Sequence, residues 1–113
     1  MATSNAAATL SRADDWSSDF AAGTITIKDG ATYLAVHTLT GFVTANVGDN
    51  ATATANAIAD DTILATGTAD TVELTSGALT YNLVIGVDII LTTTSYVIGE
   101  PSQIASMIVT FNA

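Results

Sequence analysis

The chain has 113 residues, a mass of 11.4 kDa and no cysteine, so we expect one domain held together without disulfides or thiolate metal sites. Charged residues make up 12% of the chain, against a usual share of about 25%. The net charge is −9, because Arg12 and Lys28 are the only basic residues besides one histidine. This balance argues against nucleic acid and anionic membranes as partners, since both are bound through Lys and Arg.

Residues 1–12 contain almost no bulky apolar side chains and are expected to form an extended, flexible arm. Between Leu10 and Phe20, apolar residues that include Trp16 recur near the helical period, which predicts a short helix or turn over residues 13–23. The opening lacks a basic segment followed by an apolar core, so we expect no secretory signal and a protein that is made and kept in the cytoplasm. No apolar run is long enough to cross a bilayer as a helix.

After Gly23 the apolar residues alternate with a period of two, which indicates β-strands. The pairs Asp29-Gly30 and Ser76-Gly77 predict hairpin turns. Residues 48–61 have little bulk and are expected to form a long loop or an irregular edge strand. The strands are expected at residues 24–28, 32–40, 42–47, 62–66, 71–75, 78–85, 87–98 and 104–111. About eight strands with no long helix between them predict an all-β fold over residues 24–113, an antiparallel β-sandwich or a small jelly-roll or barrel.

The segment from Leu79 to Leu91 is the most apolar part of the chain. Its odd-numbered side chains are expected to face the core, with Gly86 at a bulge or a turn. Val84 and Ile90 then point the other way and must contact either a second layer of the same chain or another subunit. The candidate interface residues are Leu10, Trp16, Phe20, Val84 and Ile90.

No motif predicts catalysis, a cofactor or a metal ion. His37 is the only histidine, and we expect a half-buried strand residue with one hydrogen-bond partner rather than a general base. The acids of residues 14–15, 49 and 60–61 do not follow the spacing of a calcium loop, and nothing places Glu73 and Glu100 around a glycosidase cleft. We therefore expect a protein that is not an enzyme.

The acidic, cysteine-free composition, the arm "MATSNAAATL", the alternating "TITIKDGATYLAV" and the dense "NLVIGVDIILTTT" together resemble the decoration (cement) proteins of tailed-phage capsids. The resemblance implies a homo-oligomer, a trimer or dimer, that binds the major capsid protein on the outer capsid surface of the virion and reinforces contacts between capsid subunits. Two alternatives remain. One is another phage β-module from a head fibre, tail or baseplate, and the other is a carbohydrate- or receptor-binding β-sandwich.

Overall fold

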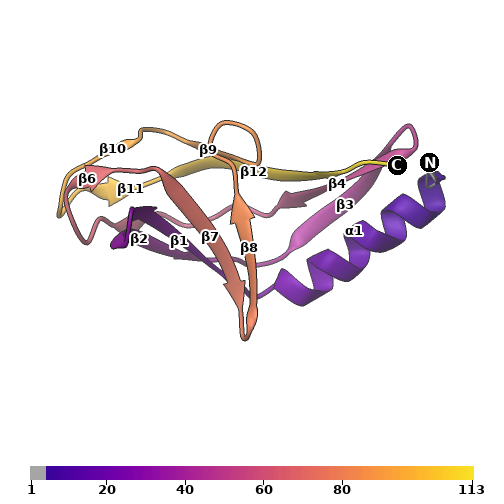
Figure 1. Ribbon diagram of the computed structural model, residues 1–113, viewed down its shortest axis with the longest axis horizontal. Helices are drawn as coiled ribbons and strands as arrows, with labels where there is room; N and C mark the ends of the chain where they lie inside the picture. The colour runs from indigo at the N-terminus through magenta and orange to yellow at the C-terminus, as the bar shows by residue number, and fades with distance from the viewer. Residues whose placement is uncertain (1–4) are drawn as a thin grey trace.

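A computed structural model describes residues 5–113, which form one helix and twelve strands (Figure 1). Residues 1–4, the start of the predicted arm, lie outside the described residues. The elements are α1 (Ala6–Phe20), β1 (Thr24–Asp29), β2 (Thr32–Thr38), β3 (Phe42–Val47), β4 (Asn50–Ala55), β5 (Asp61–Thr62), β6 (Gly67–Thr68), β7 (Thr71–Ser76), β8 (Leu79–Leu83), β9 (Ile89–Leu91), β10 (Ser95–Tyr96), β11 (Pro101–Ser102) and β12 (Ile104–Phe111).

Two four-stranded antiparallel sheets make up most of the fold. The first sheet has the order β2-β1-β7-β8 and the second has the order β3-β4-β12-β9, while β6 with β10 and β5 with β11 form two short ladders. Inward-facing residues of both sheets share one core, with Ile25 and Leu74 from the first sheet and Ile89 and Val109 from the second. The predicted all-β antiparallel sandwich is confirmed.

The helix α1 begins earlier than the sequence analysis predicted. Residues 6–12, expected to be part of a flexible arm, belong to α1 together with most of the segment expected as a short helix or turn. Asn5 caps the helix, since its side chain accepts a hydrogen bond from the Ala8 N–H at 2.9 Å. The alanines that follow it are strong helix formers. The composition that suggested an arm is therefore also the composition of a well-capped first turn.

One face of α1 covers the second sheet. Its buried residues recur every three or four positions and face β3 and β4. Polar contacts add to this packing: Thr44 donates a short hydrogen bond to Asp14, Asn46 donates to the Ala6 carbonyl, and Arg12 donates to the Asn112 carbonyl. The helix thus takes the place of the first sheet over the end of the sandwich that the first sheet does not reach (Figure 1).

Strand β4 corrects the expectation for residues 48–61. Residues 50–55 form a regular strand between β3 and β12 rather than a loop or an edge. Ala51 and Ala53 point inward and are completely buried, while Thr52 and Thr54 point outward. The lack of bulk has a packing reason, because small inward side chains let α1 lie close to the strand.

The turns follow the sequence signals more closely. The hairpins at Asp29-Gly30 and Ser76-Gly77 form as predicted, with positive φ at both glycines. Gly86 lies in a turn rather than in a strand bulge, with φ of +87°. Asp88 stabilises this turn by accepting a hydrogen bond from the Val84 N–H at 2.9 Å. Val87 is exposed as a result, although its odd number had predicted a core position.

Candidate binding surface

Three of the five predicted interface residues lie on α1 and do not form an outward surface. Phe20 is only 5% exposed, and Leu10 and Trp16 are half-buried. The correction is clearest for Phe20, whose ring belongs to the core of its own chain. The apolar face of α1 is satisfied within the chain by β3 and β4.

Trp16 is the centre of an aromatic cluster between α1 and the two sheets. Its ring centroid lies 5.0 to 5.6 Å from the centroids of four other rings, in tilted or edge-on arrangements. Those rings belong to Phe20, Phe42, Tyr81 and Phe111. Trp16, predicted as an interface residue, therefore points inward and holds the helix on the sandwich.

Val84 and Ile90, the other two predicted interface residues, are exposed. Val84 is 57% exposed beside the Gly86 turn, and Ile90 is 41% exposed on β9. Val84 follows β8 of the first sheet, whereas Ile90 lies on β9 of the second sheet. Of the two, Ile90 belongs to a larger surface.

That surface is the outward side of the second sheet, here called the neutral face. Across the ladder, Thr54 pairs with Val43 on one side and with Ile108 on the other, and Thr52 pairs in the same way with Ala45 and Thr110, so these side chains share one side of the sheet. The neutral face consists of Val43, Ala45, Val47, Asn50, Thr52, Thr54, Ile90, Ser106, Ile108 and Thr110. None of these residues is charged, in a chain whose net charge is −9.

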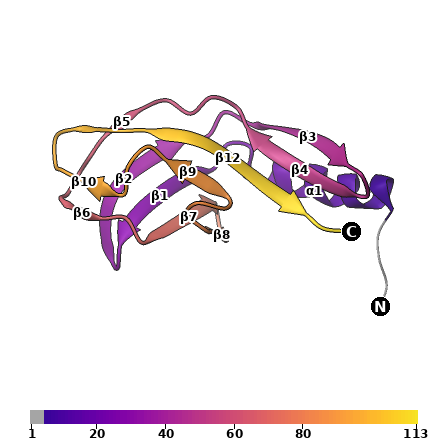
Figure 2. The same cartoon turned by 90° about the horizontal axis from the view of Figure 1, so that it is seen from above.

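Nothing within the described chain covers the neutral face. In Figure 2, β3, β4 and β12 lie side by side with α1 behind them and no element in front. Val43 and Val47 are each 62% exposed, and Ile108 is 41% exposed. Large exposed apolar patches on a folded protein often mark interaction sites. The sequence analysis found only Ile90 of this surface, because it treated β4 as a loop and so could not align β3 with β12.

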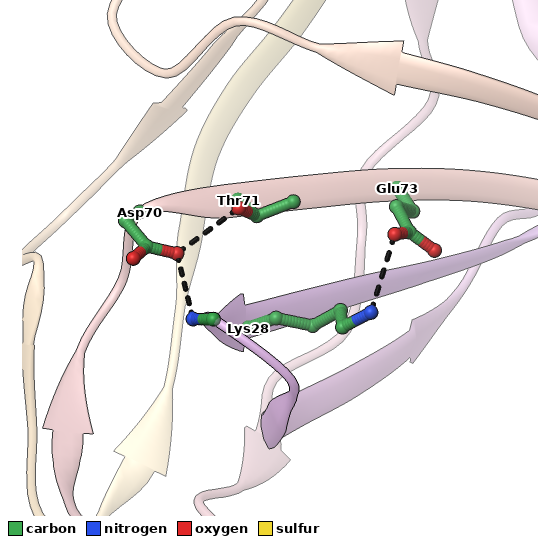
Figure 3. Close-up of polar contacts among 5 residues, drawn as sticks. Lys28, Asp70, Thr71 and Glu73 are labelled. Carbon is green, nitrogen blue, oxygen red and sulfur yellow. Dashed lines mark hydrogen bonds and ion pairs between the residues drawn. The ribbon is translucent and has the colours of Figure 1, made fainter.

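The outward side of the first sheet is different. Lys28 on β1 donates to Glu73 on β7 at 3.2 Å, and its ammonium lies 5.3 Å from the centre of the Tyr33 ring. Asp70, the residue before β7, accepts hydrogen bonds from the Thr71 hydroxyl and from the Gly30 N–H (Figure 3). Charges and their partners therefore occupy this side, and Glu73 is paired with Lys28 rather than placed beside Glu100 in a cleft.

His37 has a partner that the sequence did not predict. Its Nδ1 lies 2.9 Å from the Ala59 carbonyl, and its Nε2 lies 2.8 Å from Oγ of Ser102, which is 65 positions away in the chain. A carbonyl only accepts hydrogen bonds, so Nδ1 carries a proton, and in the neutral tautomer Nε2 accepts from Ser102. The expectation of a half-buried histidine with one partner is wrong, because His37 is buried and has two.

The His37 and Ser102 pair resembles part of a hydrolase site in its geometry but not in its surroundings. Both residues are buried, at 2% and 1% exposure, so no substrate can reach the Ser102 hydroxyl in this conformation. Tyr96 lies next to them, and burial raises the pKa of its hydroxyl above the ordinary 10.0, with Ser102 acting in the opposite direction. The three residues join the small ladders to β2 and act as a polar part of the core.

One cavity of about 500 Å³ opens between the C-terminal half of α1 and the β2–β3 connection. Its lining is mostly hydroxyl and amide groups, with Asp14 as the one carboxylate. Asp14 already accepts a hydrogen bond from Thr44, and Asn56 donates weakly to the Thr40 carbonyl. This cavity has neither a nucleophile with a base nor a set of metal ligands.

Two further features are missing from the part of the chain that the structure describes. Across residues 5–113, no three His, Cys, Asp or Glu side chains gather in a way that could hold a metal ion. Within the same residues, no helix is long and apolar enough to span a membrane.

Comparisons of the chain with protein-family models, with curated proteins and with solved structures found no match. The neutral face, defined by its geometry and lack of charge, is therefore the strongest candidate for a functional surface.

Proposed function

We propose that this protein is a structural protein of the virion, a capsid decoration (cement) protein that attaches to the major capsid protein through the neutral face. The observation that carries the proposal is that one complete outward side of a four-stranded sheet has no charge, although the chain carries eleven acidic residues. Burying an uncharged face needs no desolvation of ions, which is the largest cost of a polar interface.

The work of such a protein is mechanical. Each Å² of apolar surface buried between the neutral face and the capsid contributes about 25 cal/mol before the costs of association are subtracted. The eleven acids lie outside the neutral face, so the rest of the bound molecule stays negatively charged and keeps the particle soluble.

A carbohydrate-binding role has less support, because sugar-binding surfaces need exposed aromatic rings. Of the seven aromatic side chains, five form the cluster around Trp16, Tyr96 is buried, and only Tyr33 is strongly exposed. Another virion β-module, from a head fibre, tail or baseplate, could use the same neutral face against a different partner.

The test is co-sedimentation of the purified protein with capsids that lack it. Ile108→Lys places a charge in the middle of the neutral face, and Thr80→Lys places the same charge on exposed β8 of the first sheet. We expect Ile108→Lys to lower the bound fraction at least about tenfold, equivalent to about 1.4 kcal/mol, and Thr80→Lys to leave it nearly unchanged. Equal binding by both variants, or binding to a glycan array without binding to capsids, would overturn the proposal.

A further inference from the structure

We infer that the free edge of β3 pairs with β3 of a second copy of this chain, antiparallel and about a two-fold axis through Ala45. This inference deepens the proposed structural role. It rests on that role in one respect, because both require the chain to work in an assembly. It concerns the edge of the second sheet, whereas attachment to a capsid uses the neutral face itself.

Strand β3 lacks the features that usually protect a sheet edge. Proteins guard exposed edges with charges, proline, bulges or very short strands. Residues 42–47 contain neither a charge nor a proline, and all six pair with β4 without a register shift. The other edge of the second sheet, β9, has three residues, and the pairing of edge strand β2 with β1 is interrupted by a bulge next to Lys28.

Hydrogen bonding to β4 shows which backbone groups of β3 remain unpaired. The Asn56 N–H donates to the Gly41 carbonyl at 2.9 Å, so Gly41 and every second residue after it direct their backbone groups toward β4. Those residues include Val43, Ala45 and Val47. Phe42, Thr44 and Asn46 therefore direct their N–H and carbonyl groups outward, along an edge that no other element occupies in Figure 2.

The sequence of this edge suits a copy of itself. Val43 to Val47 reads Val-Thr-Ala-Asn-Val, which has nearly the same character in both directions. A two-fold axis at Ala45 places Thr44 opposite Asn46, so the outward backbone groups of the two strands meet and can form four hydrogen bonds at these pairs. On the neutral face, the same register places Val43 opposite Val47 twice, at positions where side chains approach closely.

Charge also favours this edge as the place where copies meet. Two chains of net charge −9 repel, and the repulsion is least where no acid lies between them. Asp49 at the β3–β4 turn lies beyond the last residue of β3. Asp14 of α1 accepts a hydrogen bond from the Thr44 side chain, so its carboxylate lies on the inward, helix-covered side of β3 and not between the two paired strands. Edge strand β8 is less suited. A two-fold axis at its central residue would place the two Tyr81 side chains opposite each other on the inward side, where each ring already packs 5.3 Å from its own Trp16.

Single cysteines in this cysteine-free chain test the register directly. A non-hydrogen-bonded antiparallel pair places its Cα atoms about 4.5 Å apart, within the range that a disulfide spans. Under mild oxidation we expect Ala45→Cys to form a covalent dimer about tenfold faster than Val47→Cys, although both side chains are exposed on the same face of the same strand. A mixture of Val43→Cys and Val47→Cys should crosslink as well as Ala45→Cys does.

Equal crosslinking rates for Ala45→Cys and Val47→Cys would overturn the inference. A second measurement avoids any dependence on disulfide chemistry: sedimentation velocity of the unmodified chain at concentrations up to about 1 mM, at low and high salt. We expect a dimer that grows with salt, is lost in Ala45→Lys and is kept in Ala45→Thr; a monomer throughout would also overturn it. Crosslinking and sedimentation velocity report the pairing without any capsid, whereas capsid binding by Ile108→Lys reports the proposed function, so failure of the one is distinguishable from failure of the other.

Discussion

Both sides of the β3-β4-β12-β9 sheet lack charged residues, but the fold covers only one of them. The inward side, with Ala51, Ala53 and Val109, is covered by α1 and the first sheet and is almost completely buried. The outward side is uncharged and uncovered, with Val43 and Val47 mostly exposed. The inward side is therefore satisfied within the chain, whereas the apolar residues of the outward side have no cover among the described residues (Figure 2).

The total accessible surface area shows that the chain does not expose an unusual amount of surface. What is unusual is where its exposed apolar residues lie. The accessible surface is 5953 Å². A compact monomer of this mass is expected to expose about 5,800 Å². The chain therefore folds as completely as an ordinary monomer, and its exposed apolar residues matter because several of them gather on the neutral face.

The largest expected effect is loss of the inward cover. Trp16→Ala removes a ring that contacts four others, and we expect the free energy of unfolding to fall by about 3 kcal/mol. Chemical denaturation measures the change, with Trp16→Phe as a control that keeps an aromatic ring and should lose less. A loss below about 1 kcal/mol would mean that α1 is not held on the sheet by this cluster.

Substitutions at Ala53 and Thr54 compare the inward and outward sides of the second sheet on the same strand, β4. Ala53→Leu forces a larger side chain under α1, and we expect the free energy of unfolding to fall by about 1 to 3 kcal/mol. Thr54→Leu places the same side chain outward, where we expect a change within about 0.5 kcal/mol. Similar losses for both variants would remove the distinction between a covered and an uncovered side.

The smallest effect expected at neutral pH concerns the buried hydroxyl of Tyr96, which forms no hydrogen bond of ordinary geometry. Because its pKa is raised above 10.0 in the folded state, the folded protein keeps this proton at pH values where the unfolded chain has lost it. Its contribution to stability is therefore complete below about pH 10 and declines as the pH rises toward the folded-state pKa.

Unfolding measured at neutral pH and at about pH 11 checks this. Tyr96→Phe should change the neutral-pH stability by less than about 1 kcal/mol and should reduce the alkaline loss. If Tyr96→Phe and the wild type lose the same stability at alkaline pH, the hydroxyl is not the group responsible. The Tyr96 hydroxyl would then be less shielded from solvent than the apolar side chains of the core.

Local patterns predicted much of the β structure. Alternation in "TITIK" and the Asp29-Gly30 turn predicted the β1–β2 hairpin, because backbone conformation at these positions depends on neighbouring residues. The same local reasoning could have found α1, since Asn5 followed by three alanines is an N-cap with strong helix formers. It could also have found β4, since Ala and Thr alternate regularly from Asn50 to Ala55.

The remaining features depend on contacts between distant residues, which no local pattern encodes. The position of Ser102 beside His37 follows from the placement of β11 against β2 and the segment around Ala59, across 65 residues. Trp16 could be identified as a candidate interface residue, but the direction of its side chain could not be predicted, because that depends on where α1 packs. The neutral face required β12 to lie beside β4, far from it in the chain.

By itself, the sequence determined the fold class, the hairpins and the shortage of charge, because strand alternation, turn geometry and side-chain ionisation are properties of single residues and their neighbours. Only the tertiary structure decided which apolar residues are buried within the chain and which stay exposed on the neutral face. The physical reason for this division is packing, because α1 covers one side of the second sheet and no described segment remains to cover the other (Figure 2).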